Sequence, residues 1–307
     1  MDFPFDVEKL SQSVVQVRSL VPPQALTASV LGIERLGHGV VIEPNLVLTI
    51  GYLITEASEV WLAAGDGRKI RGDVLGYDQE TGFGLVQALG RLDIEPIALG
   101  SSHAAQIGDA VLVAGSGGPA QAIAGRLVAK QSFSGYWEYH LDEALFTAPA
   151  HPNWGGTAVI DCFGRLIGIG SLNIQDAEVN GRPQGVNMVV PIDLLKPLLG
   201  DLKAYGRPNR PARPWLGLYG TESDGRVLVI GVAERGPARD AGIEPGDVLV
   251  AVGTKQIESL EGFYRDVWAS GPAGCDVILS ILRNGSVTQA VVVTVDRAEL
   301  LWRPVLH

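Results

Sequence analysis

The chain has 307 residues, of which 46% are hydrophobic and 19% are charged, and its formal net charge is −10 at neutral pH. This composition is typical of a packed globular protein with two domains and excludes wholesale disorder. The negative charge argues against a broad surface for nucleic acid or anionic membranes. No apolar run reaches the length of a membrane span.

Two features bear on the cellular compartment. The N-terminus has neither the basic start nor the apolar stretch of a secretory signal, so we expect a cytoplasmic protein, or a periplasmic one if the native N-terminus has been trimmed. The two cysteines, Cys162 and Cys275, lie in strand-like apolar runs of different regions. We expect both to be buried free thiols rather than a disulfide or a metal site.

The first long region is rich in short strands separated by turn residues. Apolar, β-branched runs occur at 13–17, 39–42, 46–49, 110–113 and 165–169. This spacing favours an all-β sandwich or a pair of barrels. The region closes at 191–199, where proline and aspartate precede an apolar run and predict a helix.

The remaining chain is separated from this region by a linker. Three prolines and several basic residues at 206–214 indicate a semi-rigid connection. Beyond it we expect several strands and one helix at about 259–269. The predicted organisation is an N-terminal segment (1–12), a first domain (13–200), a linker (201–214), a second domain (215–298) and a tail (299–307).

Several runs of the first domain resemble, in order, the strands and loops of one protease family. They are Gly-His-Gly-Val-Val-Ile at 37–42, Leu-Thr-Ile-Gly-Tyr-Leu-Ile at 48–54, Tyr-Asp-Gln-Glu-Thr-Gly-Phe-Gly-Leu at 77–85, Asn-Trp-Gly-Gly-Thr at 153–157 and Gly-Val-Asn-Met-Val-Val-Pro at 185–191. They are similar to the corresponding runs of the HtrA family of serine proteases. The resemblance implies a mainly β protein, a trypsin-like double β-barrel followed by a PDZ domain.

Matching these runs residue by residue leaves all three catalytic positions without their expected side chains. Tyr52 stands at the position of the histidine base, Gly82 at that of the aspartate and Trp154 at that of the nucleophilic serine. A phenol with a pKa near 10 is a poor general base, glycine has no carboxylate, and an indole has no nucleophilic oxygen or sulfur.

A fourth change affects the oxyanion hole. The resemblance implies that its donors are the backbone N–H of the nucleophile and that of the residue two positions earlier. That earlier residue is Pro152, which has no N–H. Loss of one such donor typically costs about 100- to 1,000-fold in rate. Four losses together indicate a pseudoprotease rather than a single inactivating substitution.

Polar residues near Trp154 could form a different kind of site. His151 and Thr157 flank it by three residues on either side, and Asp142 and Glu143 precede it. They are candidates for a relocated nucleophile or a metal site, but a loop histidine and a strand threonine are the favoured interpretation. His38 is expected to pack locally. Trp154 itself either fills the old specificity pocket, which we favour, or forms an exposed anchor for a partner.

The second domain resembles an HtrA-type PDZ domain. The runs Gly-Pro-Ala-Arg-Asp-Ala-Gly-Ile at 236–243 and Pro-Gly-Asp-Val-Leu-Val at 245–250 carry this likeness. Trp215, Leu216, Gly217 and Leu218 match the loop that binds a peptide's terminal carboxylate through its N–H groups. Phe263, Tyr264 and Val267 have helical spacing, and we expect at least one of them to line the peptide groove rather than the core.

These features favour a catalytically inactive HtrA-like protein that binds polypeptide C-termini or unfolded segments through its PDZ domain. It would act as a holdase, a scaffold or a regulator of an active HtrA-type protease, with no cofactor. The resemblance also implies a homo-oligomer, with a trimer as the leading form and Phe3 and Phe5 as contact residues.

The sequence leaves two further functions open. One is an active serine-type or other endopeptidase with a non-standard site. The second is a metal or small-ligand binder in the vacated cleft, for which His140 and His151 are the only candidates.

Overall fold

The computed structural model describes residues 3–179 and 181–303, which form two compact units. Among the described residues, the first unit contains 3–132, 142–179, 181–209 and 303, and the second contains 133–141 and 210–302. Met1 and Asp2 at the N-terminus and residues 304–307 of the expected tail lie outside the described part. No helix within that part is long and apolar enough to cross a membrane.

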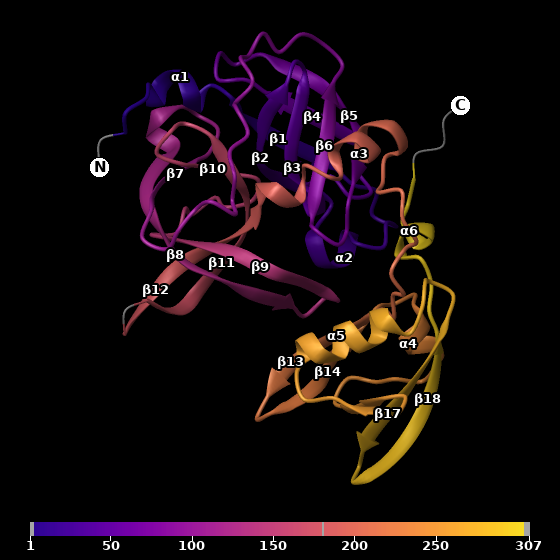
Figure 1. The fold of residues 1–307 in the computed structure, drawn as a ribbon. Helices are drawn as coiled ribbons and strands as arrows, with labels where there is room; N and C mark the ends of the chain where they lie inside the picture. The colour runs from indigo at the N-terminus through magenta and orange to yellow at the C-terminus, as the bar shows by residue number, and fades with distance from the viewer. Residues whose placement is uncertain (1–2, 180, 304–307) are drawn as a thin grey trace. The chain divides into compact units, whose positions relative to one another are not determined.

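The first unit contains two closed β-barrels, drawn from indigo through magenta to salmon in Figure 1. The strand order of the first barrel is β1-β2-β3-β6-β5-β4, and β1 pairs with β4 to close it. Its strands are β1 (Val14–Leu20), β2 (Glu34–Glu43), β3 (Leu46–Ile50), β4 (Glu59–Ala63), β5 (Lys69–Tyr77) and β6 (Phe83–Ala88). The residues of β3 are all buried, as the apolar run there predicts.

The second barrel has the order β10-β11-β12-β9-β8-β7 and closes through β7 and β10. Its strands are β7 (Ala110–Ala114), β8 (Ala122–Gly135), β9 (Tyr139–Ala148), β10 (Ala158–Ile160), β11 (Leu166–Val179) and β12 (Arg182–Pro191). Apolar side chains from several of these strands, among them Val111, Leu127, Leu145 and Val189, fill its interior. The two barrels confirm the predicted trypsin-like double barrel.

Short helical elements connect the strands of the first unit. They are α1 (Val7–Ser11), α2 (Ala28–Leu31), α3 (Leu199–Tyr205) and the 3₁₀ turns η1 (Gly51–Leu53), η2 (Pro119–Gln121) and η3 (Ile192–Leu194). The predicted continuous helix at 191–199 is wrong. Pro197 lacks an N–H and disfavours helical geometry at Lys196, so η3 ends early and α3 begins only at Leu199. α3 therefore lies partly within the stretch 201–214 that we expected to be linker.

The second unit contains a sheet with the order β13-β14-β15-β17-β18, and β16 pairs with β15. Figure 1 shows these elements in orange and yellow. Its strands are β13 (Leu218–Ser223), β14 (Arg226–Val232), β15 (Val248–Val252), β16 (Lys255–Gln256), β17 (Asp276–Arg283) and β18 (Ser286–Val293), and its helices are α4 (Pro237–Asp240), α5 (Leu260–Ala269) and α6 (Arg297–Leu300). The predicted helix at 259–269 is confirmed, and the Ser259 side chain caps it by accepting from the Gly262 N–H.

The cysteines are both free, but the prediction that both are buried is wrong. Cys162 is exposed because it lies in the turn between β10 and β11. In that turn the Asp161 carboxylate accepts from the Phe163 and Arg165 N–H groups and directs the chain outward. Cys275 is part-buried, with its sulfur 3.7 Å from the Thr294 hydroxyl.

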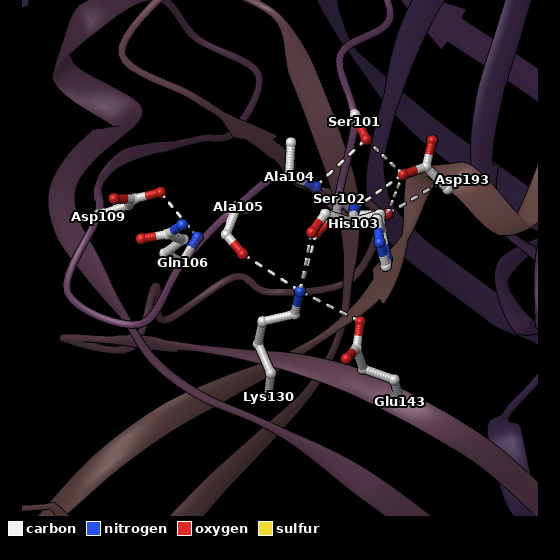
Figure 2. Close-up of polar contacts among 10 residues, drawn as sticks. All are labelled: Ser101, Ser102, His103, Ala104, Ala105, Gln106, Asp109, Lys130, Glu143 and Asp193. Carbon is white, nitrogen blue, oxygen red and sulfur yellow. Dashed lines mark hydrogen bonds and ion pairs between the residues drawn. The ribbon is translucent and has the colours of Figure 1, made fainter.

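A polar cluster fixes the segment that leads into the second barrel (Figure 2). Asp193, in η3, accepts hydrogen bonds from the hydroxyls of Ser101 and Ser102, from the His103 N–H and from Lys196. Lys130 of β8 donates to the carbonyl groups of Ser102, His103 and Ala105 and pairs with Glu143 of β9 at 3.3 Å. These charged groups are satisfied by one another and by the chain between them, so the cluster has a structural role.

The carboxylate at the centre of this cluster has a perturbed pKa. Burial acts to raise the pKa of Asp193, but the hydrogen bonds from Lys196, His103 and the two serines outweigh it and hold the pKa well below its ordinary value of 3.8. A carboxylate with a depressed pKa contributes stability above its unfolded-state pKa and loses it as the pH falls.

We therefore expect Asp193→Ala to lower the free energy of unfolding of the first unit by about 1–2 kcal/mol at pH 7, because charge-assisted hydrogen bonds are lost from a side chain that is 28% exposed. The difference from the unmodified chain should shrink below about pH 4. Calorimetric melts at pH 7 and below about pH 4 measure both differences in unfolding free energy. The control is Asp66→Ala, because Asp66 is exposed. Equal effects of the two substitutions at pH 7 would contradict the structural role of Asp193.

Candidate functional site

The positions expected to hold a catalytic triad come together at the ends of three loops of the first unit. Tyr52 lies in η1, Gly82 directly precedes β6, and Trp154 lies between β9 and β10. The Gly51 N–H donates to the Gly82 carbonyl at 2.6 Å. A Cβ atom added to Gly155 would lie 2.7 Å from the Tyr52 hydroxyl oxygen. The three positions therefore form one site, although none holds the expected catalytic side chain.

Tyr52 is unsuited to act as a base in this setting. Its hydroxyl donates to the Ser171 carbonyl at 2.8 Å, so its proton is already engaged. Burial raises the pKa of Tyr52 well above its ordinary value of 10, while a hydrogen bond from Trp154 acts in the opposite direction. The phenol remains protonated at neutral pH and cannot accept a proton from a nucleophile.

Trp154 is part-buried, and its indole N–H engages the Tyr52 hydroxyl. Its carbonyl accepts from both the N–H and the hydroxyl of Thr157, at 3.2 and 2.9 Å. An indole–phenol contact thus stands where a serine–histidine pair would be needed. The geometry does not present the indole as a freely projecting anchor.

Gly82, at the position expected for the aspartate, lacks a carboxylate and also has an unusual backbone conformation. Gly82 has φ of 86°, a region that residues with a Cβ rarely adopt. Its N–H donates to the Asp78 carbonyl at 2.8 Å. An aspartate at this position would be strained, so the backbone here is not arranged to hold a carboxylate.

The loop before Trp154 offers few donors for an oxyanion. Pro152 has no N–H, and the Asn153 N–H donates to Nδ1 of His151 at 3.1 Å. Stabilisation of a tetrahedral intermediate requires donors aimed at one point. Neither Pro152 nor Asn153 offers a free backbone N–H for this purpose.

His151 is a satisfied structural histidine. It is 1% exposed, its Nδ1 accepts from Asn153, and its Nε2 donates to the Gln121 carbonyl at 3.1 Å. Its own N–H donates to Asn187 Oδ1 at 2.6 Å. Both ring nitrogens are used, which leaves none for a metal or a reacting group.

The remaining polar candidates near the cleft also have structural partners. The Thr157 hydroxyl donates to the Trp154 carbonyl, and Glu143 pairs with Lys130. Asp142 is exposed on β9 and engaged by a neighbour, and His140 belongs to the second unit. Within residues 3–179 and 181–303, no three histidine, cysteine, aspartate or glutamate side chains gather into a metal site.

A hydroxyl–imidazole contact that no local sequence pattern indicates lies near this loop. The Ser116 Oγ is 2.9 Å from Nδ1 of His38, and the Ser116 N–H also donates to that nitrogen at 3.0 Å. Burial, together with the neighbouring His151, lowers the pKa of His38 to about 4. Its Nε2 has no hydrogen-bond partner in the described part of the chain. The imidazole is therefore a weak base without an orienting carboxylate.

The expected carboxylate-binding loop lies at the start of β13. The N–H groups of Leu216, Gly217 and Leu218 converge on one point, which is possible because Gly217 has φ of 78°. The Leu216 and Leu218 side chains are buried in the core of the unit. Trp215 is also buried, with the Arg297 guanidinium 5.6 Å from its ring centroid.

A carboxylate from the same unit already occupies this loop. Glu138 Oε2 accepts from the Leu216 N–H at 2.9 Å, and Glu138 Oε1 accepts from those of Gly217 and Leu218 at 2.7 and 3.1 Å. Burial raises the pKa of Glu138 to about 7, although the three N–H donors act to lower it. The loop thus holds a carboxylate in the way expected of a peptide terminus.

The three helical residues divide between core and groove. Phe263 and Val267 are buried within the core cluster. The Tyr264 hydroxyl donates to the Gly135 carbonyl at 2.8 Å and accepts from the Glu138 N–H at 3.2 Å. Tyr264 is therefore the member of the set that contacts the segment that carries Glu138.

Sequence reasoning missed this occupant, the segment Phe133–Leu141. Its signal in the sequence is a density of aromatic residues, because Phe133, Tyr136, Trp137 and Tyr139 fall within seven positions. Their rings form a packed group, with Trp137 stacked on Tyr139 at a centroid distance of 5.5 Å. An exposed hairpin would rarely carry so many aromatics without a binding role.

Comparison with known families and proteins agrees with both folds. Residues 37–169 match the model of the trypsin-like peptidase domain, and residues 214–294 match that of the PDZ domain. The chain is 27% identical over 267 residues to the periplasmic serine endoprotease DegP of Salmonella typhimurium, covering 81% of this chain and 54% of that protein. It is 26% identical to the serine endoprotease DegS of Haemophilus influenzae, covering 86% and 78% of the two chains. The chain thus spans about half the length of the DegP relative.

Solved structures share the fold over most of the chain. The HtrA-type protease AlgW with a decapeptide superposes with a TM-score of 0.54 at 20% identity, covering 97% of this chain and 98% of that one. The serine endoprotease from Yersinia pestis superposes with a TM-score of 0.53 at 22% identity, covering 96% and 99%. The chain therefore contains a trypsin-like peptidase domain followed by a PDZ domain, the domain arrangement of the HtrA-type proteases that it resembles.

Proposed function

We propose that this chain is a catalytically inactive HtrA-type protein that binds polypeptides through its PDZ domain. The observation that carries the proposal is the meeting of Tyr52, Gly82 and Trp154 in one site that contains no base, carboxylate or nucleophile at these positions. The oxyanion position at Pro152 supports the same conclusion, since residual catalysis in a protease without its triad depends on that hole. The relatives named as endoproteases are expected to differ from this chain at these positions.

The PDZ domain supports the binding half of the proposal. Three backbone N–H groups at 216–218 hold a carboxylate, which is the chemistry that recognises a chain terminus. The partners would be polypeptide C-termini or unfolded segments, among them the termini of an active HtrA-type protease. Such a protein would act as a holdase, a scaffold or a regulator. The second candidate function is a hydrolase that uses Ser116 and His38, favoured only by their 2.9 Å contact.

Proteolysis provides the first test. The purified chain incubated with casein should release no fragments detectable by mass spectrometry, because no activated nucleophile is available. The Ser116→Ala variant is the matched control and should behave identically. Cleavage by the unmodified chain that disappears in Ser116→Ala would establish the hydrolase function. Cleavage retained in both, with contaminating proteases excluded, would equally contradict the proposal.

Carboxylate recognition provides the second test. Decapeptides displayed on an array with free C-termini should be retained by the Glu138→Ala variant, whose loop donors are free. The same peptides with C-terminal amides should bind about 10-fold or more weakly, because a charged acceptor is lost from three N–H donors. Fluorescence polarisation of the most tightly bound peptides gives the ratio of the dissociation constants of the acid and amide forms. Equal binding of acids and amides would contradict terminal-carboxylate recognition.

We also propose that the chain assembles as a homo-oligomer, with a trimer as the leading form, through its N-terminal aromatics. The Phe3 and Phe5 rings are 5.3 Å apart by centroid and both are part-buried. Light scattering coupled to gel filtration should give a multiple of the monomer mass. The double variant Phe3→Ala, Phe5→Ala should have the mass of a monomer. The control Phe163→Ala, at an exposed phenylalanine elsewhere, should keep the mass of the oligomer. A monomeric unmodified chain would contradict the proposal.

A further inference from the structure

The segment Phe133–Leu141 makes a second contact with the main chain of the PDZ sheet. The Gly220 N–H, on β13, donates to the Tyr136 carbonyl at 2.9 Å. β13 pairs with β14 on its other side, so this contact is made at the free edge of the sheet. Addition of an extended chain to a sheet edge uses main-chain hydrogen bonds of this kind.

The two contacts together reproduce the pattern of a bound chain terminus. The carboxylate of Glu138 enters the loop at 216–218, and the carbonyl two residues earlier, on Tyr136, pairs with the strand that follows the loop. Tyr136, Trp137 and Glu138 form the turn between β8 and β9, and Glu138 has φ of 59°, so both groups are presented from a turn. The Glu138 side chain thus stands in for a C-terminal carboxylate.

Side chains of α5 hold the same segment in place. Tyr264 bridges Gly135 and Glu138 through its hydroxyl. The His140 ring contacts the Ser134 hydroxyl at 3.0 Å and Arg265 at 3.2 Å. The Tyr264 and Arg265 contacts come from α5, the helix that would otherwise wall the groove for an incoming peptide, while the Ser134–His140 contact lies within the segment.

We propose that Phe133–Leu141 is an internal ligand that closes the PDZ groove against external polypeptide C-termini. This inference rests on the proposed peptide-binding function and adds its regulation. The Tyr136 ring adds to the contact, because it meets the Tyr219 ring of β13 edge-on at a centroid distance of 6.0 Å.

The chemistry of the contact makes it reversible. Burial disfavours the charged form of Glu138, and its backbone has φ of 59°, which is costly for a residue other than glycine. Against this, the segment is tethered, and a tethered ligand competes with an effective concentration in the millimolar range. The apparent affinity for an external peptide falls by the fraction of molecules whose groove is open.

The test compares four forms of the full chain with the strongest free-carboxylate decapeptide from the array. Glu138→Ala removes the internal carboxylate, and Tyr264→Phe removes only the hydroxyl that bridges the segment, while keeping the ring in the core. Glu143→Ala is the matched control, since Glu143 is a glutamate on the same hairpin that is 47% exposed and pairs with Lys130. Fluorescence polarisation gives the dissociation constant for each form.

Glu138→Ala should bind the peptide about 10- to 100-fold more tightly than the unmodified chain, because the three donors no longer have an internal acceptor. Tyr264→Phe should shift affinity in the same direction by a smaller factor, and Glu143→Ala should leave it unchanged. Equal affinity of the unmodified chain and Glu138→Ala would overturn the closure while leaving the peptide-binding function intact. Failure of Glu138→Ala to retain any carboxylate-dependent peptide would instead overturn the proposed function itself.

Discussion

The three N–H groups of Leu216, Gly217 and Leu218 impose the constraint on which the second unit depends. They point to one place because of the left-handed turn at Gly217, and converging donors require an acceptor. The Glu138 carboxylate supplies it from within the chain. The loop donors are therefore satisfied in the absence of a partner.

The trypsin-like domain carries other side chains at the three positions expected to hold a triad. In an active trypsin-like site, a hydroxyl and an imidazole share a proton under the influence of a carboxylate. In this chain the indole of Trp154 contacts the phenol of Tyr52, whose proton is donated to Ser171. Both barrels are present, and the neighbouring His151 is committed to backbone partners.

The sequence predicted the fold well because its signals are local. Short β-rich runs, turn glycines and motif order are sufficient for two barrels and a PDZ domain, and the Ser259 cap marks the start of α5. It failed at 191–199, where Pro197 interrupts the helical pattern, and at Cys162, which a tight turn carries to the surface. The contacts of His38 with Ser116 and of Glu138 with the loop join residues 78 or more positions apart. Such pairs follow from topology, and no local pattern identifies them.

The central claim is that the loop donors are already engaged in the free protein. Amide hydrogen exchange at Leu216, Gly217 and Leu218, resolved by NMR on the ligand-free chain, tests it directly. These three amides should exchange slowly in the unmodified chain and much faster in Glu138→Ala, while amides in the core of β17 remain protected in both. Fast exchange of the three amides in the unmodified chain would show that the groove is open and would contradict the account.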